Sequence, residues 1–369
     1  MTWEIPLTDV VIDEDAIEAV AECLRSGWLT MGPRTTAFEA AVAEWAGAEH
    51  AVAVSSGTAA LHLTCAALGL GPGDEVIVPA FTFLATANAP RYCGATPVLC
   101  DVVSAAAPNL DPADVERRIT ASTRAVIAVH MCGYPADIAA LRALCDERGL
   151  ALIEDAAQAF GALDRRAGTL GRAGCLSFFS KKQLAVGEGG MVLTADAELA
   201  ARVRLLRSHA MTSGTWDRHR GHEDSYDVVD VGFNFRLDEP RAALGLARLP
   251  RVGEEIERRR ATVRAYRERL GELAMWDDGD VTAGSPFAFT VLFDSAATRA
   301  RVRDSLAEQR IQTTRYPAVH HLTEFARYAA RGSLPHAEAA AERHLALPLS
   351  AHTPLAHVER VAAAVRAAL

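Results

Sequence analysis

The sequence predicts an α/β fold, in which helices cover both faces of a mostly parallel sheet, followed by a smaller C-terminal α+β domain. In the first two thirds of the chain, short apolar runs alternate with amphipathic segments of helical period, which is typical of parallel strands buried on both faces. The 369 residues exceed what one hydrophobic core usually holds, so two domains are expected. After Pro240 the alternation gives way to a long charged segment.

The strands of the sheet are expected at six apolar runs, and helical patterns separate or follow them. The predicted strands cover residues 51–54, 75–79, 96–101, 124–130, 151–154 and 174–179. The predicted helices cover residues 35–46, 58–69, 83–92, 111–118, 136–148 and 196–209. Strands that alternate with helices in this way indicate crossover connections, and therefore a parallel sheet.

The C-terminal third begins with a long helix at residues 241–273, which we expect to break at Pro250 because proline removes a helical hydrogen bond. Its charge cluster at residues 254–260 is interpreted as a solvated helix face. Further elements are a strand at residues 287–293 and helices at residues 297–309, 335–345 and 355–368. We therefore expect a large domain at residues 1–245 and a small domain at residues 246–369.

Composition excludes several classes of protein. A formal net charge of −9 argues against a nucleic-acid partner, although one local anion site can still bind a phosphorylated small molecule. The cysteines are odd in number and form no CxxC pair, so neither a metal site nor a disulfide framework is expected, and a cytoplasmic location fits. With no apolar run of about 18 residues and no basic start before an apolar run, no membrane span or signal peptide is expected.

Lysine use is unusual in this chain. Only Lys181 and Lys182 are lysines among 38 basic residues, and the other 36 are arginines. A lysine can lose its proton and attack a carbonyl, whereas arginine keeps its proton at any working pH. The lysine pair therefore indicates imine chemistry, although a genome rich in Ala and Arg codons would also deplete lysine.

Two motifs lie where a predicted strand runs into a helix, the place where open parallel sheets bind ligands. Residues 55–61 (SSGTAAL) offer small side chains and the free N–H groups of a helix N-terminus to an anion; a Ser/Thr-capped turn without a ligand would look the same. In residues 154–158 (EDAAQ), Asp155 is suited to hold a protonated ring nitrogen, or else to cap the next helix.

Two further residues complete a pattern. Phe83, after the strand at residues 75–79, is suited to stack on a flat ring or to fill a core. Asn234, between two phenylalanines, suggests a hydrogen-bonding task or a turn. An anion cradle, an aromatic stacker, an acid for a ring nitrogen and an imine-forming lysine are together what one cofactor requires, pyridoxal 5′-phosphate (PLP).

With these motifs the chain resembles the PLP-dependent sugar aminotransferases of the DegT/DnrJ/EryC1/StrS family, which have the fold-type-I architecture. The resemblance covers nearly the whole chain and includes residues 26–33 (SGWLTMGP), 177–190, 315–320 (RYPAVH) and 345–350. It implies a large PLP-binding domain and a cytoplasmic homodimer with shared active sites.

The resemblance also implies residue roles. Lys182 matches the Schiff-base lysine, with Lys181 as a neighbouring surface charge, and Asp155 matches the partner of the ring nitrogen, so Lys182 and Asp155 are the candidate catalytic residues. The candidate cofactor-binding residues are Gly57, Thr58 and Ser177 at the phosphate, Gln158 near the ring hydroxyl, Phe83 on the ring, Asp155, Lys182, and Asn234 from the neighbouring subunit. No metal ligand is predicted. Many family members have a histidine at the position of Phe160, so that part of the substrate pocket is undefined.

The implied reaction moves an amino group from L-glutamate to a nucleotide-linked keto sugar, most often a dTDP-4-keto-6-deoxy sugar, as in the biosynthesis of antibiotic amino sugars. A basic-aromatic stretch at residues 212–227 is either a contact for the nucleotide diphosphate or a solvated loop; it contains Trp216, Arg218, His219, Arg220 and His222. Three alternatives remain: a cyclitol or keto-inositol aminotransferase, a sugar dehydratase, and a non-catalytic PLP-fold partner protein. Sugar dehydratases of the family have a histidine in place of the Schiff-base lysine, so Lys182 argues against that alternative.

Overall fold

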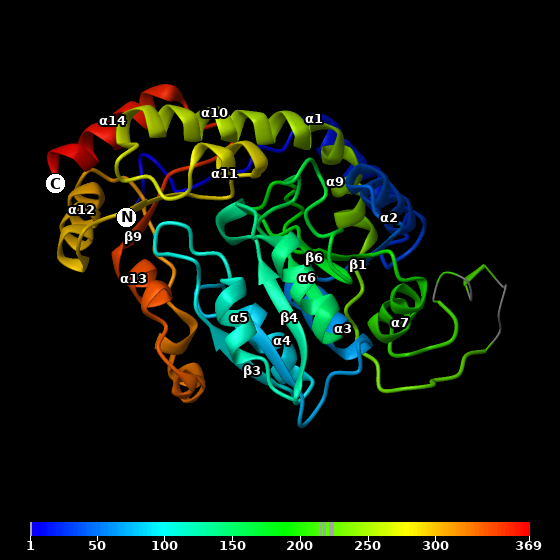
Figure 1. Ribbon diagram of the computed structural model, residues 1–369. Coiled ribbons are helices and arrows are strands. Elements are labelled where there is room, and N and C mark those ends of the chain that lie inside the picture. Colours follow the sequence, from blue (N-terminus) through cyan, green and yellow to red (C-terminus); the bar gives the residue numbers. More distant parts are fainter. Residues whose placement is uncertain (1, 215, 217–218, 221–224) are drawn as a thin grey trace.

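The computed structural model describes residues 2–214, 216, 219–220 and 225–369. A seven-stranded sheet in the order β1-β7-β6-β5-β4-β2-β3 forms its centre (Figure 1). The strands are β1 (His50–Val54), β2 (Glu75–Pro79), β3 (Thr96–Cys100), β4 (Thr123–Val129), β5 (Ala151–Asp155), β6 (Ala173–Ser177) and β7 (Gly190–Thr194). The predicted α/β class is confirmed.

The sheet is mostly parallel, as expected. Only β7 runs antiparallel to its neighbours β1 and β6, and the other pairs are parallel. Alternate side chains of β2 enter different cores: Val76 and Val78 join one hydrophobic cluster, and Ile77 joins another. The apolar runs are therefore continuous because both faces of the sheet are covered. All six predicted strands are present; β7, which follows the glycine-rich loop, was not predicted.

Helices cover the sheet on both faces (Figure 1). They are α1 (Glu14–Arg25), α2 (Pro33–Ala46), α3 (Gly57–Ala67), α4 (Leu84–Tyr92), α5 (Pro112–Arg118), α6 (Ile138–Arg148) and α7 (Ala197–Arg207). Six of them were predicted to within two residues at each end. The missed helix α1 has a readable start, because the Asp13 carboxylate accepts the Ala16 N–H at 2.8 Å and acidic residues occupy its first turn.

The long C-terminal helix breaks at Pro250, as predicted. It consists of α9 (Glu239–Arg248), the short 3₁₀ turn η2 (Leu249–Arg251) and α10 (Val252–Leu270). The remaining elements are α11 (Asp278–Ala283), β8 (Phe289–Leu292), α12 (Ala296–Glu308), η3 (Val319–His321), η4 (Thr323–Arg331), α13 (Pro335–Arg343), β9 (His344–Leu347) and α14 (Leu355–Ala367). The helix predicted at residues 335–345 ends at Arg343, because His344 and Leu345 pair with β8 in an antiparallel ladder.

The division into two domains stays a proposal, and the packing refines it. The boundary between residues 245 and 246 falls inside α9, which packs on α1 and α2, whereas α10 packs on α14 (Figure 1). The first residues of the chain join the C-terminal part: the Glu4 N–H donates to the Arg310 carbonyl and the Gln312 N–H to the Ile5 carbonyl, both at 2.9 Å. The small unit therefore includes this N-terminal segment.

The structure bears on two expectations from composition, those about membrane spans and about cysteines. In the described part of the chain, no helix is both long and apolar enough to cross a membrane. All seven cysteines are free thiols, and all but Cys93 are buried. Burial raises the pKa of these thiols, for example that of Cys145 to about 12, which is the behaviour of small core residues rather than reactive ones.

Candidate active site

The N-terminus of α3 forms an anion cradle beside the end of β6. The Ser56 hydroxyl accepts the Ala59 N–H at 3.1 Å and so caps the helix. The N–H groups of Gly57 and Thr58, at the first two helical positions, have no intrahelical acceptor. A Cβ at Gly57 would lie 2.9 Å from the Ser177 Cβ, so only glycine brings the serine hydroxyl this close to the helix end.

The start of β7 closes the cradle from a second side. A Cβ at Gly190 would lie 2.4 Å from the Ser56 carbonyl carbon, and Gly190 pairs with both Val54 and Ser177. A cavity of about 430 Å³ opens beside the cradle and is lined by Ser55, Ser56, Thr58, Ala59, His62, Tyr92 and Phe235. None of these described lining residues is acidic, which suits a phosphate.

The two lysines have different surroundings. Lys181 is exposed, whereas Lys182 is largely covered and its Nζ lies 4.0 Å from the centre of the Phe287 ring. Burial lowers the pKa of Lys182 to about 8, although the nearby Asp155 carboxylate favours the charged amine. An amine with this pKa is partly neutral near pH 7.5, as an imine-forming lysine must be.

Asp155 ends β5 with its carboxylate buried. The Thr86 hydroxyl donates to Oδ2 at 2.7 Å and the Ala157 N–H donates to Oδ1 at 3.1 Å. Burial raises the pKa of Asp155, while these two hydrogen bonds and the Lys182 charge oppose the rise. Asp155 forms no ion pair with any residue that the structure describes, so it retains the capacity to pair with a cationic ring nitrogen of a ligand.

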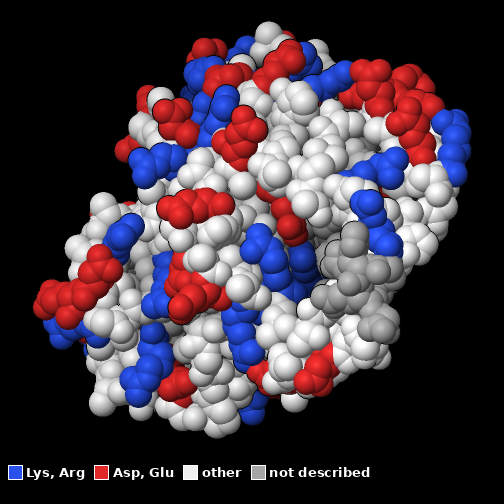
Figure 2. Space-filling model, turned by 90° about the vertical axis from the view of Figure 1, so that its right-hand side faces the viewer, with Lys and Arg blue, Asp and Glu red and all other residues white. Residues whose placement is uncertain are grey.

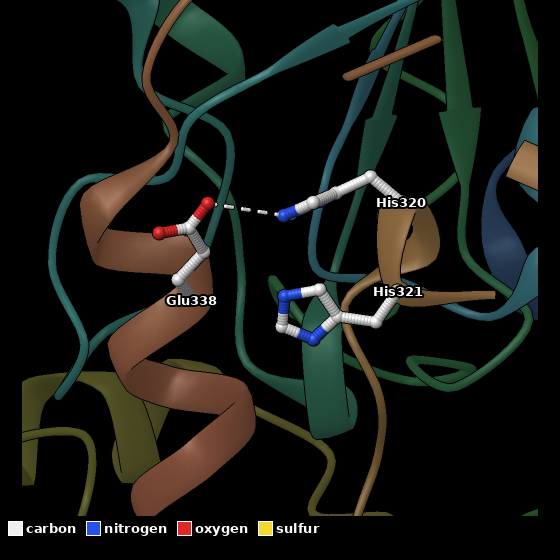
Figure 3. A group of neighbouring side chains, drawn as sticks. All are labelled: His320, His321 and Glu338. Atoms are coloured by element: carbon white, nitrogen blue, oxygen red, sulfur yellow. Dashed lines mark hydrogen bonds and ion pairs between the residues drawn. The ribbon is translucent and has the colours of Figure 1, made fainter. Parts of the chain in front are cut away.

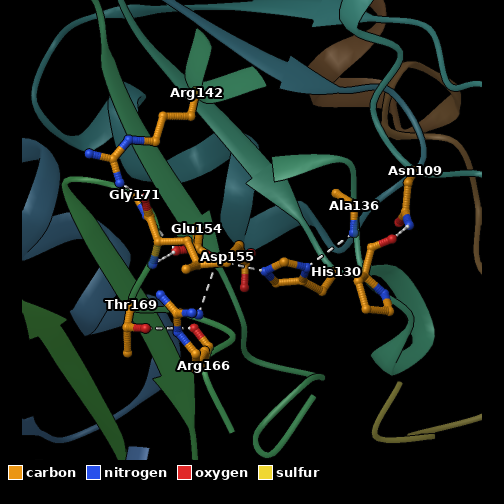
Figure 4. Close-up of polar contacts among 12 residues, drawn as sticks. Asn109, His130, Ala136, Arg142, Glu154, Asp155, Arg166, Thr169 and Gly171 are labelled. Atoms are coloured by element: carbon orange, nitrogen blue, oxygen red, sulfur yellow. Dashed lines mark hydrogen bonds and ion pairs between the residues drawn. The ribbon is translucent and has the colours of Figure 1, made fainter. Parts of the chain in front are cut away.

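The preceding residue, Glu154, is fully buried and has a different task (Figure 4). Its carboxylate accepts the His130 Nε2–H at 3.0 Å and three backbone N–H groups, those of Gly168, Leu170 and Gly171. Because His130 Nδ1 accepts the Ala136 N–H at 3.1 Å, the proton must lie on Nε2 and the ring is neutral. Burial alone would raise the pKa of Glu154, but these donors outweigh it and keep the pKa below its usual value.

Gln158 and Phe83 lie near the same strand ends. The Gln158 amide oxygen accepts the Cys132 N–H at 2.8 Å, so its NH₂ group is the part left for a ligand. Phe83 directly precedes α4, and 59% of its surface is exposed. An exposed phenylalanine at a strand's carboxyl edge is available to cover a ring, so the alternative of a core residue is wrong.

Asn234 lies at the edge of the cradle without entering it. Its backbone pairs with Ser208, the carbonyl of the next residue, Phe235, accepts the Ser55 N–H at 2.8 Å, and its side chain is exposed. The structure thus groups Gly57, Thr58 and Ser177 in one place, and Asp155 with Lys182 in another. Asn234 stays outside both groups in the single chain.

The interpretation of residues 254–260 as a solvated face is wrong for Arg259, and Glu255 and Arg260 are only partly exposed. Only 4% of Arg259 is exposed, because it falls on the buried stripe of α10, which consists of Val252, Ile256, Arg259, Thr262, Val263, Tyr266 and Leu270. Its Nη1 lies 3.5 Å from the Pro286 carbonyl, its Nε has no hydrogen-bond partner, and it forms no ion pair with any described residue. Burial lowers the pKa of Arg259 to about 10.

Arg259 belongs to the neighbourhood of the lysine. It lines a small cavity with Lys182, Arg248 and two acids, Asp9 and Glu255. Both carboxylates favour the charged form of Arg259, but neither forms an ion pair with it. Glu255 itself pairs with Arg248 at 3.4 Å. A buried cation that forms no direct ion pair is costly unless a ligand supplies the anion, so Arg259 is a ligand-binding candidate that the sequence analysis missed. Its signal was the 3–4 residue spacing of the buried stripe.

Phe160 and the stretch 212–227 were the two positions considered for the substrate pocket. Phe160 is buried, with its ring 4.3 Å from that of Trp45 and 6.0 Å from that of Phe178, so it packs in the core. Of the stretch 212–227, Arg218 and His222 lie outside the described residues, while Trp216 and His219 place their rings 4.6 and 4.5 Å from that of Trp28.

Comparisons with known proteins identify the family of this chain. Residues 10–366 match the DegT/DnrJ/EryC1/StrS aminotransferase family. The chain belongs to this family.

The chain is 42% identical over 265 residues to GDP-perosamine synthase of Caulobacter vibrioides, covering 71% of this chain and 69% of that protein. It is 37% identical to a UDP-N-acetyl-3-dehydro-alpha-D-glucosamine 3-aminotransferase of Acidithiobacillus ferrooxidans, over 99% and 98% of the two chains. The crystal structure of DesV from S. venezuelae superposes with a TM-score of 0.90 at 37% identity, over 99% and 98% of the two chains.

The enzyme is therefore a PLP-dependent aminotransferase, and its residues fit that cofactor. The described residues that line the cavity beside the cradle are not acidic, the carboxylate of Asp155 forms no ion pair with a described residue, and the amine of Lys182 is desolvated. When bound, PLP supplies the carbonyl that an amine can condense with and a ring that accepts electrons. The role of each residue in that site stays a prediction.

We expect the Lys182→Ala variant to lose the yellow colour of the lysine-bound cofactor, and at least about a thousandfold in activity, because no other amine is placed to bond the cofactor and move the proton. Lys181→Ala is the matched control and should keep both, since its side chain is exposed. Visible absorption and turnover of the two variants test this. Equal losses in the two would contradict the assignment.

The rate at which the cofactor-free enzyme binds PLP covalently should rise with pH and level off above about pH 8, where Lys182 loses its proton. Only the neutral amine attacks a carbonyl, and lowering its pKa makes roughly a quarter of it neutral at pH 7.5, against about 0.1% for an ordinary lysine. Stopped-flow absorbance between pH 6.5 and 10 measures the profile. A rate that still climbs at pH 10 would show that Lys182 is not desolvated.

Proposed function

We propose that this enzyme transfers the amino group of L-glutamate to a nucleotide-linked keto sugar in the cytoplasm, giving an amino sugar. The observation that carries the proposal is the juxtaposition of a desolvated lysine, an unpaired buried carboxylate and a glycine-built anion cradle. The names of two relatives mention a GDP-linked and a UDP-linked sugar, which supports a nucleotide sugar as the amino acceptor of this enzyme. A dTDP-4-keto-6-deoxy sugar for antibiotic biosynthesis is the acceptor we propose to test first.

The charge distribution supports an anionic substrate. Although the chain carries a formal net charge of −9, lysine and arginine side chains gather in a hollow on the face shown in Figure 2. Local cations of this kind attract a ligand such as a nucleoside diphosphate, whatever the net charge of the whole protein. The acidic composition therefore excludes neither the acceptor nor the donor.

Each residue has a defined task in the proposed reaction. The N–H groups of Gly57 and Thr58 and the hydroxyl of Ser177 bind the cofactor phosphate, and Phe83 covers the ring. Asp155 holds the proton at the ring nitrogen. The amine of Lys182 would serve as general base and general acid, taking a proton from the substrate carbon and holding it for return. Because the phosphate and ring contacts fix the cofactor relative to Lys182, the proton has only a short distance to move.

The amino donor brings a carboxylate, and Arg259 is the cation placed to bind it. The guanidinium is buried, forms no ion pair with any described residue, and lines the same small cavity as Lys182, together with Asp9 and Glu255. Arginine suits this task because its planar fork binds a carboxylate through two hydrogen bonds and cannot lose its charge. We therefore propose that Arg259 recognises a carboxylate of L-glutamate.

Adding L-glutamate to the purified enzyme should replace the yellow band with that of the amino form of the cofactor. In Arg259→Gln the half-saturating glutamate concentration should rise roughly 10- to 100-fold, which corresponds to one lost charged hydrogen-bonding partner. The melting temperature should not fall, because a buried unpaired charge is removed. A spectral titration and a thermal melt measure the two effects.

The control for this variant is Arg258→Gln on the same helix, where the arginine pairs with Glu254 in solvent. It should leave the glutamate titration unchanged. Unchanged glutamate affinity in Arg259→Gln would remove Arg259 from donor binding. A wild-type enzyme that stays yellow with glutamate would instead show that the donor is a different amine.

We also propose a homodimer in which Asn234 completes the neighbouring active site. The Asn234 side chain is exposed at the edge of the cradle. The segment before it exposes a row of apolar residues, of which Val228, Val229 and Val231 are 52%, 55% and 80% exposed. Exposed apolar side chains this close together favour a protein partner, and a second copy would place Asn234 beside the partner's phosphate.

Mixing two impaired variants tests the shared site. Lys182→Ala and Asn234→Ala each impair both sites of their own dimer. A mixed dimer has one site with both changes and one with neither, so equal mixing after subunit exchange should restore roughly a quarter of wild-type activity. If Asn234 acts within its own chain, mixing restores nothing beyond the average of the two variants.

A further inference from the structure

A cluster of two histidines and a glutamate lies outside the catalytic residues. His320 and His321 end the short turn η3, and Glu338 lies in the first turn of α13. One potential ligand atom from each side chain lies within 4.8 Å of the other two. Figure 3 shows both imidazole rings pointing a nitrogen toward the Glu338 carboxylate. The three side chains converge on one point.

The surroundings of the His320 ring suit metal binding. Only 8% of its surface is exposed, so the ring is held in place by packing. Nδ1 has no partner among the described residues, so no second hydrogen bond fixes the tautomer. By contrast, both ring nitrogens of His344 are used, one by the Ala340 carbonyl and one by the Tyr316 N–H. His320 can therefore offer an Nε2 lone pair.

The spacing fits a small divalent ion. His320 Nε2 lies 3.2 Å from Glu338 Oε1, close to the separation of about 3.3 Å between two ligands bound tetrahedrally at about 2.0–2.1 Å. The third ligand, His321, must move inward, and it can do so because it is exposed. Two histidines and one carboxylate are a ligand set used by zinc sites that keep a fourth position for water.

The backbone on both sides of the cluster is already fixed. The Val319 N–H donates to the Ala80 carbonyl at 2.7 Å, which attaches η3 to the loop after β2. The Asp101 carboxylate accepts the N–H groups of His336 and Ala337 at 3.2 and 2.8 Å and so holds the start of α13. Asp101 also adds a negative charge near His320. An ion here would find the ligands largely preorganised.

We propose that His320, His321 and Glu338 form a binding site for one divalent transition-metal ion, with Zn²⁺ as the reference ion. The site departs from the expectation that the chain has no metal ligands. It takes no part in the amino transfer, since neither catalytic residue belongs to it. Its effect is to join η3 to α13, and thereby to stabilise the C-terminal part against the loop that carries Phe83.

The test uses tag-free, PLP-bound enzyme titrated with Zn²⁺ against a coloured chelator. One ion per chain is expected to bind saturably and to raise the melting temperature. His321→Ala removes an exposed ligand without disturbing the core, and should weaken binding at least about tenfold and abolish the thermal shift. Glu338→Gln should weaken it too. The cofactor absorbance should not change on adding zinc, which shows that the ion is not taken by PLP.

His336→Ala is the matched control, because it removes an exposed histidine of the same helix outside the cluster. It should bind zinc as the wild type does. The proposal is overturned if zinc binds without saturating at one ion per chain. It is equally overturned if His321→Ala binds as tightly as the wild type, or if His336→Ala and His321→Ala lose affinity equally.

Discussion

The site depends on the close approach of three backbone segments, which only glycine allows. At Gly57 any side chain would meet Ser177, and at Gly190 it would meet the Ser56 carbonyl group. These contacts bring the end of β1, the end of β6 and the start of β7 to one place, and the N–H groups of α3 then face the same space as the serine hydroxyl. A larger residue at either position would open the cradle. A cofactor ring would then no longer be held at a fixed position relative to Lys182 and Asp155.

The two adjacent acids of β5, Glu154 and Asp155, have different surroundings because they point to opposite faces of the sheet. Successive side chains point to opposite faces, so Glu154 is buried among His130 and three backbone donors, while Asp155 faces the site with only two donors. Glu154 has enough hydrogen bonds to stay ionised in the interior, and it fixes the loop at residues 168–171. Asp155 has too few, which leaves it available to a cationic ligand group.

The sequence predicted most of the fold because apolar runs and helical periods are local signals. It also separated Lys182 from Lys181, but only through the family resemblance; the structure adds the physical reason, which is burial. Arg259 was misread because a run of charges suggests solvent, whereas its position in the 3–4 stripe of α10 decides its burial. β7 was missed because its glycine start continues a loop. The role proposed for Asn234 involves a second chain, so the sequence pattern of one chain does not encode it.

The two cations that line one small cavity, Lys182 and Arg259, respond differently to burial. Burial acts on both, but the outcomes differ: the pKa of Lys182 falls to about 8, so part of the amine is neutral at working pH, whereas that of Arg259 falls only to about 10, so it stays charged. The first result suits a nucleophile and the second an anchor for an anion, which are the roles proposed for the two residues. Exchanging the two residue types would remove both functions, because an arginine cannot form an imine and a buried lysine would lose the charge that binds a carboxylate.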